Sequence, residues 1–333
     1  MPKNIAVFID GTDDTFTSGA KNNSNVGILY EASINDERQF KFYSDGPGIG
    51  GHLVASTVGT GVNTRVQRGY NFCVENYENG DQIFIFGFSR GAFAARSVAG
   101  MIRAVGVLRK DAQATKDDAF AVYEKAKDDP AAAAAFKAAN SIDVKIHFIG
   151  VWETVGSIDV PIGLTLDAIP LDPFHDVSLG PDIENAFHAV SIDEERWDFQ
   201  PTYFNAYLAQ PGQTVEEVFF PGVHSDVGGG YDDDASLSKV PLAWLATHAQ
   251  EHGLLIADRS VLDVPAGAWA GMLHDSFSAI YDFRSRFFRP IDFNAKVSVA
   301  AKQRLDAAAG VCKPGPYNPP NFDKANTGYN WIT

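Results

Sequence analysis

The chain has 333 residues, of which 45% are hydrophobic, and this is enough to bury a large core. Its formal net charge of −15 argues against nucleic acid as a partner, because phosphates require a basic surface, and against tight electrostatic adsorption to anionic lipid. The two cysteines, Cys73 and Cys312, are too few for a disulfide framework, so we expect a reducing compartment.

The N-terminal region is not expected to target the chain to a membrane. The apolar run of residues 5–9 is too short for a signal peptide and leads directly into Asp10. No window of about 18 apolar residues exists, so no membrane-spanning helix is predicted. We therefore expect the protein to be made in the cytoplasm without a signal peptide.

The first eighty residues predict two strands, a loop and a helix. Residues 5–9 and 39–43 have the apolar content of strands, and the glycine-rich segment of residues 46–61 is expected to be a loop. Residues 64–77 have helical spacing, and Asn79-Gly80-Asp81 ends that helix before the next strand.

The segment DQIFIFGFSRGAFAARSVAG, residues 81–100, has the form of a nucleophile elbow. An apolar run typical of a buried parallel strand precedes Ser89, and small and apolar residues with helical spacing follow it. Side chains at Gly87 and Gly91 would collide with neighbouring backbone, which explains why glycines flank the serine. The alternative is a tight strand-to-helix turn without chemistry.

Three later segments have an open interpretation. Residues 112–140 are alanine-rich and charged, and they predict two surface helices separated near Pro130, an insertion near residues 110–140. The segment near residues 156–182, which includes the apolar run PIGLTLDAIPLDP, is either a lid or a packed connection. The aromatic-rich residues 269–288 either line an acyl pocket or cover the sheet, and the cluster Arg284, Arg286 and Arg289 is interpreted as solvated helix charges.

Three more strands are predicted, and a titratable residue follows each of them. Residues 144–152 lead to Glu153, residues 186–192 to Asp193, and residues 217–220 to PGVHSDVGGGY. Ligands of doubly wound sheets gather at the carboxyl ends of the strands. The alternation of strands and helices therefore predicts one α/β domain, residues 1–333, with a mostly parallel doubly wound sheet, helices on both faces and a site at that edge.

A serine hydroxyl is a poor nucleophile at neutral pH, and imidazole can take its proton and return it to the leaving group. His224 is the predicted base, because it is the histidine in a glycine-bracketed loop directly after a core strand. The other histidines are predicted inside strands (His147, His188), on helices or helical segments (His248, His252, His274) or in loops without a preceding core strand (His52, His175).

The third member of a triad is a carboxylate that holds the imidazole. Glu153 and Asp193 both follow strands, and either fits the order serine, acid, histidine that α/β-hydrolases show along the chain. The one that is not used would be a buried or capping carboxylate.

Acyl transfer also requires N–H donors for the oxyanion. We predict the backbone N–H of Arg90 as one donor and that of Gly11 or Thr12, in the turn after the first strand, as the other. Asp10 is expected to hold this turn through hydrogen bonds, since a carboxylate beside an oxyanion would repel it. Asp226 is expected to support the His224 loop.

Several motifs together resemble a known family. They are FIDGT near the start, SNV at residues 24–26, ENYENGDQIFIFGFSRGAFAARSVAGMI, FIGVWETVG, FHDVSL, AFHAVSIDEER, FPGVHSDVGGGY and YNPPNF. This set, spanning residues 5–322, is similar to the uncharacterised α/β hydrolase family that includes the type VI secretion phospholipase effectors of the first lipase class.

The resemblance implies an α/β-hydrolase fold with a Ser-Asp-His triad, carried onto Ser89, His224 and the acid of the family's W-D-T motif. This chain has Glu153 where that aspartate would stand, so Asp193 remains an alternative. The resemblance also implies an acyl ester or lipid substrate, no metal or other cofactor, transient contact with a membrane surface, and a secretion-machinery or immunity partner. It further implies delivery outside the cell or to a target-cell periplasm by a secretion system.

Two other classes of function are weighed against the esterase. Ile9-Asp10-Gly11-Thr12 resembles the nucleophile motif of haloacid-dehalogenase phosphatases, but that motif requires an aspartate where Phe8 stands. Asp226 with residues 232–234 does not match the spacing of an EF-hand calcium loop. The remaining alternative is a catalytically silent hydrolase-fold binding protein.

Overall fold

The fold is taken from a computed structural model of the chain. The structure describes residues 2–11, 14–20, 22–46, 55–158, 169–170, 174–277, 286–322 and 328–333.

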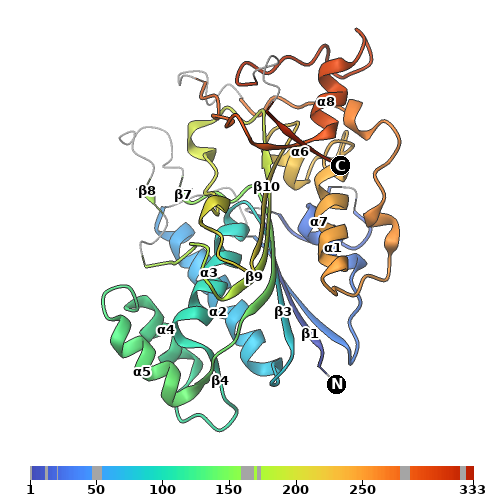
Figure 1. Cartoon of the computed structure of the whole chain (residues 1–333). Helices are drawn as coiled ribbons and strands as arrows, with labels where there is room; N and C mark the ends of the chain where they lie inside the picture. The colour runs from blue at the N-terminus through green and yellow to red at the C-terminus, as the bar shows by residue number, and fades with distance from the viewer. Residues whose placement is uncertain are drawn as a thin grey trace.

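An eight-stranded sheet, parallel at every pairing, forms the centre of the molecule (Figure 1). Its strand order is β12-β11-β10-β9-β6-β3-β1-β2. The strands are β1 (Asn4–Ile9), β2 (Gln39–Ser44), β3 (Gln82–Phe88), β6 (Ile146–Trp152), β9 (Ile183–Ser191), β10 (Thr214–Phe220), β11 (Lys296–Ser298) and β12 (Asn330–Ile332).

Helices cover both faces of this sheet (Figure 1). They form two groups, one on each face of the sheet, as Figure 1 shows. The first group is α2 (Ala55–Asn76), α3 (Arg90–Val105), α4 (Lys116–Glu124) and α5 (Pro130–Asn140), and the second is α1 (Asn25–Ala32), α6 (His224–Gly228), α7 (Lys239–Glu251) and α8 (Val299–Asp306). The predicted α/β architecture with a mostly parallel sheet is confirmed.

The central strands are apolar on both sides because both of their faces are covered. In β3, Ile83 and Ile85 pack with α2 and α3, whereas Phe84 and Phe86 pack with α1 and α7 on the opposite face. Burial on both faces explains why this segment is a continuous apolar run rather than an alternating one.

Short elements complete the fold. Two small antiparallel pairs lie outside the main sheet, β4 (Val107–Leu108) with β5 (Ser141–Ile142), and β7 (Ser157–Ile158) with β8 (Ile169–Pro170). Short 3-10 helices span Trp197–Phe199 (η1), Ala206–Leu208 (η2), Arg259–Leu262 (η3) and Ala268–Ala270 (η4).

Two sequence-based expectations about elements are wrong. Helix α2 begins at Ala55, although residues 46–61 were expected to be loop throughout. A glycine inside a helix costs only about 1 kcal/mol relative to alanine. The packed part of α2 is therefore able to extend the helix through its glycine-containing first turns. The segment around His274, expected to be helical, has no helix from residue 271 to 277.

The two helices predicted in the segment 112–140 are present as α4 and α5, and Pro130 is the first residue of α5. Among the described residues, no helix combines the length and the apolar character required to cross a bilayer.

Candidate active site

Ser89 lies between β3 and α3 with a backbone φ of 57°, in the left-handed region that non-glycine residues rarely adopt. The two flanking glycines permit this turn. A Cβ on Gly87 would lie 2.6 Å from Cα of Ala92, and a Cβ on Gly91 would lie 2.2 Å from the carbonyl oxygen of Asp10. The elbow is therefore pressed against the end of β1, and it holds Ser89 at the N-terminus of α3.

His224 is the first residue of α6, four residues after β10 ends. Its Nε2 lies 2.8 Å from the hydroxyl oxygen of Ser89, and both residues are buried. Strands β3 and β10 belong to one parallel sheet, so their carboxyl ends lie at the same edge of it. Ser89 and His224, which are 135 positions apart in the chain, meet at that edge. In this geometry the hydroxyl donates to an unprotonated Nε2.

The other ring nitrogen of His224, Nδ1, lies 3.0 Å from Oε2 of Glu153. An ionised carboxylate only accepts hydrogen bonds, so Nδ1 carries the proton and Nε2 is left as the acceptor for Ser89. Glu153 follows β6, is fully buried, and has a left-handed φ of 50°. The structure thus brings Ser89, His224 and Glu153 into one hydrogen-bonded chain.

Arg289 was expected to be a solvated helix charge, and this expectation is wrong. Its side chain is 1% exposed, and it lies in a segment without helix. Nη1 and Nη2 of the guanidinium donate to Oε1 and Oε2 of Glu153 at 2.7 and 2.9 Å. A signal in the sequence is Pro290, because a residue before proline is disfavoured in helical conformation. The exposed Arg286 of the same cluster pairs with Glu195, and Arg284 lies outside the described residues.

The ion pair of Arg289 and Glu153 affects the protonation of both Glu153 and His224. Burial alone would raise the pKa of Glu153, but the Arg289 guanidinium and the hydrogen bonds from His224 and Arg289 hold it well below its ordinary value. Burial lowers the pKa of His224, against the opposing effect of Glu153. Near neutral pH the site therefore contains a carboxylate and a neutral imidazole, the state in which imidazole accepts a proton.

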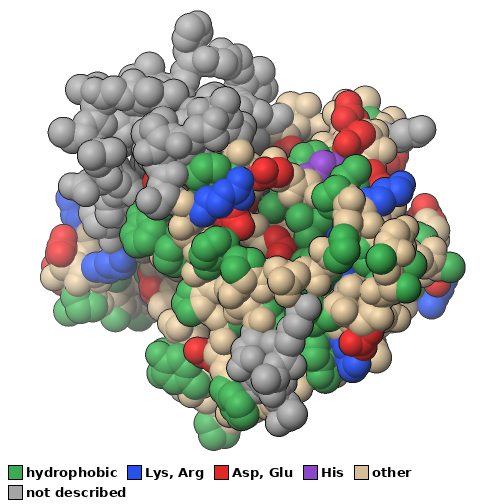
Figure 2. Space-filling view, turned by 90° about the horizontal axis from the view of Figure 1, so that it is seen from above, with side chains coloured by type: hydrophobic (Ala, Val, Ile, Leu, Met, Phe, Trp, Pro, Cys, Tyr) green, Lys and Arg blue, Asp and Glu red, His purple; other side chains and the backbone are tan. Residues whose placement is uncertain are grey.

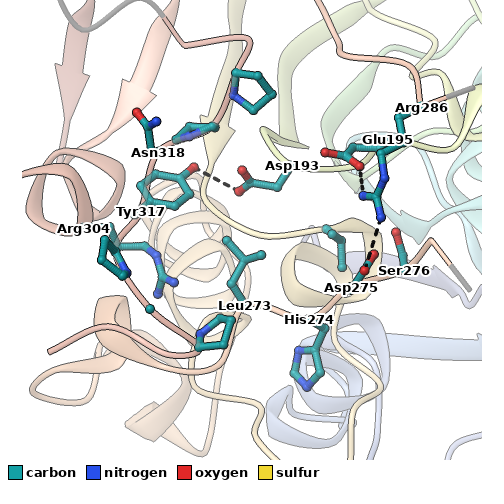
Figure 3. A pocket seen from close by; sticks show the side chains of 16 residues that line it. Asp193, Glu195, Leu273, His274, Asp275, Ser276, Arg286, Arg304, Tyr317 and Asn318 are labelled. Atoms are coloured by element: carbon teal, nitrogen blue, oxygen red, sulfur yellow. Dashed lines mark hydrogen bonds and ion pairs between the residues drawn. The ribbon is translucent and has the colours of Figure 1, made fainter. Parts of the chain in front are cut away.

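Asp193, the alternative acid, makes other contacts. Its Oδ2 accepts hydrogen bonds from the Gly222 N–H at 2.7 Å and the Tyr317 hydroxyl at 3.0 Å, and Figure 3 shows the carboxyl turned toward Tyr317. Burial raises its pKa to about 7. Asp193 supports the loop before His224, and in this structure the imidazole contacts Glu153.

A cavity of about 420 Å³ lies beside this loop. Figure 3 shows Asp193, Arg304 and Tyr317 on one side of it and His274 and Ser276 on the other. Seen from above, acidic and basic side chains and a histidine lie among hydrophobic side chains at this end of the molecule (Figure 2).

Two further groups surround His224 and were not singled out from the sequence. The carboxylate of Glu194 accepts the His224 backbone N–H at 3.2 Å and also binds the side chains of Arg196 and Ser276. The Phe199 ring, on η1, packs edge-on against the imidazole with ring centres 4.9 Å apart. Glu194 thus holds the backbone of His224, whereas Phe199 packs on its ring, and no local sequence pattern indicates either contact.

The turn after β1 is held by Asp10, as expected. Oδ1 of Asp10 accepts the Gly11 N–H at 2.8 Å, and Oδ2 accepts the hydroxyls of Ser24 and Tyr43. Burial raises the pKa of Asp10. The Gly11 N–H therefore faces a carboxylate in this structure, and Thr12 lies outside the described residues. Arg90 is the first residue of α3, and the oxyanion donors remain a prediction.

Asp226 lies on α6 and supports the His224 loop. Its Oδ2 accepts the Val223 N–H, and its Oδ1 lies 2.6 Å from Nδ1 of His274. Within the described parts of the chain, no group of three or more His, Cys, Asp or Glu side chains is placed to hold a metal ion.

The remaining histidines are engaged elsewhere or are not described. His188, inside β9, accepts the Thr154 N–H and contacts Glu217. His52 and most of the apolar run in the segment 156–182 lie outside the described residues. In the segment 269–288, Trp269 packs against the core and Leu273 lines the cavity, so the described part both covers the sheet and borders a cavity.

Comparison with known proteins provides independent information. Residues 3–248 match the family model of the catalytic domain of Tle1-like phospholipase effectors of the type VI secretion system. An uncharacterized protein of Saccharomyces cerevisiae is 31% identical over 232 residues, which cover 61% of this chain and 33% of the yeast protein. The chain thus matches about a third of that relative's length.

The fold also resembles a solved structure. The crystal structure of an uncharacterized protein from Pseudomonas aeruginosa aligns with a TM-score of 0.50 and 18% identity, covering 80% of this chain and 48% of that one. At this identity the likeness concerns the fold alone.

Proposed function

The chain belongs to the family of Tle1-like phospholipase effector catalytic domains, and on this premise we propose that it is a serine esterase that cleaves acyl esters of lipids. One observation supports this proposal above the others. Ser89, His224 and Glu153 form a continuous hydrogen-bonded chain at the carboxyl edge of the sheet, with distances of 2.8 and 3.0 Å. Nucleophile, base and orienting acid are the groups that acyl transfer requires.

In the proposed reaction the hydroxyl oxygen of Ser89 attacks the acyl carbonyl carbon, and its proton passes to Nε2 of His224. The carboxylate of Glu153 stabilises the resulting imidazolium through Nδ1–H. The imidazolium then protonates the leaving alcohol, and an acyl-enzyme forms on Ser89. Water, deprotonated by His224, attacks this ester and releases the fatty acid. The backbone N–H of Arg90 and a donor from the turn after β1 are the proposed oxyanion ligands.

We further propose that exposed aromatic side chains beside the triad contact the lipid aggregate. Trp197 is 54% exposed and begins η1, the element that also presents Phe199 to His224. Phe288 is 43% exposed and directly precedes Arg289. Aromatic side chains are favoured at membrane–water interfaces, and these two lie in segments that also contact the triad.

A fluorophosphonate probe tests the proposed chemistry. We expect it to label the wild-type protein and not Ser89→Ala, and we expect Ser89→Ala to lose hydrolysis of p-nitrophenyl esters by at least about 1,000-fold. Ser97→Ala is the matched control, because Ser97 is a buried serine of α3, the helix that follows Ser89, and its hydroxyl donates to the Phe93 carbonyl. That variant keeps both labelling and turnover.

The other outcomes identify the competing functions. Absence of labelling in a folded wild-type protein would favour a catalytically silent binding protein. Loss of activity in EDTA would favour a metal-dependent enzyme, whereas a serine esterase retains its activity. Esters of graded chain length, assayed beside intact phospholipids, then define the acyl length and head group.

We also propose that the protein acts outside the cell that makes it, as the description of the matched family suggests for its effectors. Detection of the chain in the medium of its source organism, dependent on an intact secretion apparatus, tests this proposal. An immunity partner would co-purify with the chain from the same organism.

A further inference from the structure

The buried Arg289 is not explained by the chemistry of a serine triad alone. The acid of such a triad orients the imidazole and stabilises imidazolium, and a permanent cation bound to that acid opposes the second effect. Placing a guanidinium in a nearly water-free site also carries a large desolvation penalty. Because Arg289 opposes the stabilisation of imidazolium and is costly to bury, we expect it to serve another function in the site.

The contacts of Arg289 indicate what that function is. Nη1 donates to Glu153 and also to the carbonyl and hydroxyl oxygens of Ser191, at the end of β9. Nη2 donates to the other oxygen of Glu153 and to the carbonyl oxygen of Phe199, on η1. The guanidinium thus fastens the acid that follows β6 to two neighbouring segments, one of which carries the ring packed on His224.

We propose that Arg289 is a positioning residue of the catalytic site, which holds the carboxylate of Glu153 in the one orientation that presents Oε2 to His224. This inference rests on the proposed esterase function. Glutamate has one more rotatable bond than aspartate, so its carboxylate has more orientations available at this position. The planar guanidinium binds both carboxylate oxygens side by side and removes that freedom.

The same contact affects the charge balance around the imidazole. The charged groups facing His224 are Glu153 after β6, Glu194 and Arg196 after β9, and Arg289 through Glu153. Asp226, on the same helix as His224, pairs with His274 instead. Removing the guanidinium would leave the charge of Glu153 uncompensated beside the imidazole, which favours imidazolium and raises the pKa of His224.

Two variants separate orientation from charge. In Arg289→Met both the charge and the paired hydrogen bonds are lost, so we expect kcat to fall by roughly 100-fold with little change in KM, and the acid limb of the pH profile to move to higher pH. In Arg289→Lys the charge is kept without the planar fork, so kcat falls while the acid limb stays near its wild-type position.

Arg304→Met is the matched control. Arg304 is likewise 1% exposed, but its guanidinium donates hydrogen bonds to the carbonyl oxygens of Trp269, Gly271 and Lys313 rather than to Glu153. This variant is expected to lower the melting temperature while kcat and the acid limb remain those of the wild type. Steady-state kinetics with a soluble p-nitrophenyl ester across pH, on variants shown to be folded by circular dichroism, provide the comparison.

Wild-type kcat in either Arg289 variant would overturn the proposal, and so would a loss of kcat in Arg304→Met equal to that in Arg289→Met. If Arg289→Met does not fold, Arg289→Lys alone decides. A wild-type protein without Ser89-dependent turnover refutes the proposed function instead. In that case NMR titration of the His224 imidazole still tests the coupling between Arg289 and His224. A higher imidazole pKa in Arg289→Met than in the wild type supports this coupling, and an unchanged pKa overturns it.

Discussion

Glu153 has three polar neighbours, Ser191, Arg289 and His224, and each makes a different contact with its carboxylate. Its left-handed backbone ends β6 and turns the side chain back across the sheet edge, where the Ser191 N–H binds Oε1 at 2.7 Å. Arg289 keeps the carboxylate ionised despite burial, and His224 takes the remaining hydrogen bond. Asp193 lies in comparable burial without such a cation on its carboxylate, and its pKa is raised to about 7. The contrast shows that the partner, rather than burial, separates the two acids.

Asp193 leads to a prediction about stability. Its carboxyl group keeps its proton in the folded state up to about pH 7, while the unfolded chain releases it near pH 4, so the unfolded state binds fewer protons between these values. The free energy of unfolding contributed by this residue therefore falls as pH rises from about 4 to about 7. Asp193→Asn does not titrate and still accepts hydrogen bonds from Gly222 and Tyr317.

We expect Asp193→Asn to be more stable than the wild type at pH 8, by on the order of 2–4 kcal/mol, with the difference shrinking toward pH 4. Urea unfolding at several pH values measures this difference. An advantage that does not vary with pH would show that the side chain does not titrate in this range. Retained esterase activity in the variant would agree with Glu153 as the acid.

At the scale of elements, the elbow depends on how closely α3 approaches β1. Strands β1 and β3 are neighbours, and the first turn of α3 crosses the end of β1 with only the hydrogen of Gly91 between them. A helix that begins this close to a strand holds Ser89 outward through backbone contact, not through its own side chain. The position of the Ser89 hydroxyl therefore depends on a contact between two elements, β1 and α3, that are separated by four others in the chain.

Gly91→Ala tests this contact. The added methyl carbon would lie 2.2 and 2.3 Å from the carbonyl oxygens of Asp10 and Ile9, which are backbone atoms that move only with the strand. We expect a loss of about 3 kcal/mol in the free energy of unfolding, and loss of fluorophosphonate labelling at Ser89. Gly315→Ala, at a position with no neighbouring atom within 4 Å, is expected to behave as the wild type. Equal behaviour of the two variants in thermal melts and labelling would contradict the packing argument.

At the scale of the whole molecule, the charge of −15 and the exposed aromatic side chains act on a lipid surface in opposite ways. An anionic bilayer repels an acidic protein over distances of about a Debye length, whereas burial of an aromatic ring does not depend on lipid charge. A zwitterionic bilayer carries no net charge, so aromatic rings can be buried in it without electrostatic repulsion of the protein.

We expect the protein to hydrolyse and co-sediment with zwitterionic phosphatidylcholine vesicles better than with anionic ones at low salt, and this difference should narrow as salt is added. Trp197→Ser should reduce co-sedimentation while leaving hydrolysis of a soluble ester unchanged. Tyr207→Ser is the control, since Tyr207 is 82% exposed on η2, whereas the ring that packs on His224 comes from η1. Equal loss in the two variants would show that the contact is not specific to the side of the triad.

The sequence alone determined the elements that local pattern encodes. Apolar runs with turn residues between them identified six of the eight strands of the parallel sheet, and two glycines around Ser89 identified the elbow, because strand burial and steric room at a turn depend on neighbouring residues. The three-residue strands β11 and β12 were not predicted, since such short segments show no apolar run. The order of strands with titratable residues after them also predicted which side chains would gather at one edge, and Glu153, Ser89 and His224 lie there.

Only the tertiary structure shows which of the two carboxylates contacts the imidazole of His224, and that Arg289 lies beside it. Both contacts join atoms far apart in the chain: Glu153 and Arg289 are separated by 136 positions, and their pairing appears in no local pattern. The free energy of a buried charge is set by what surrounds it in space, so an arginine that resembles a surface charge in sequence becomes, once folded, the partner of a buried carboxylate.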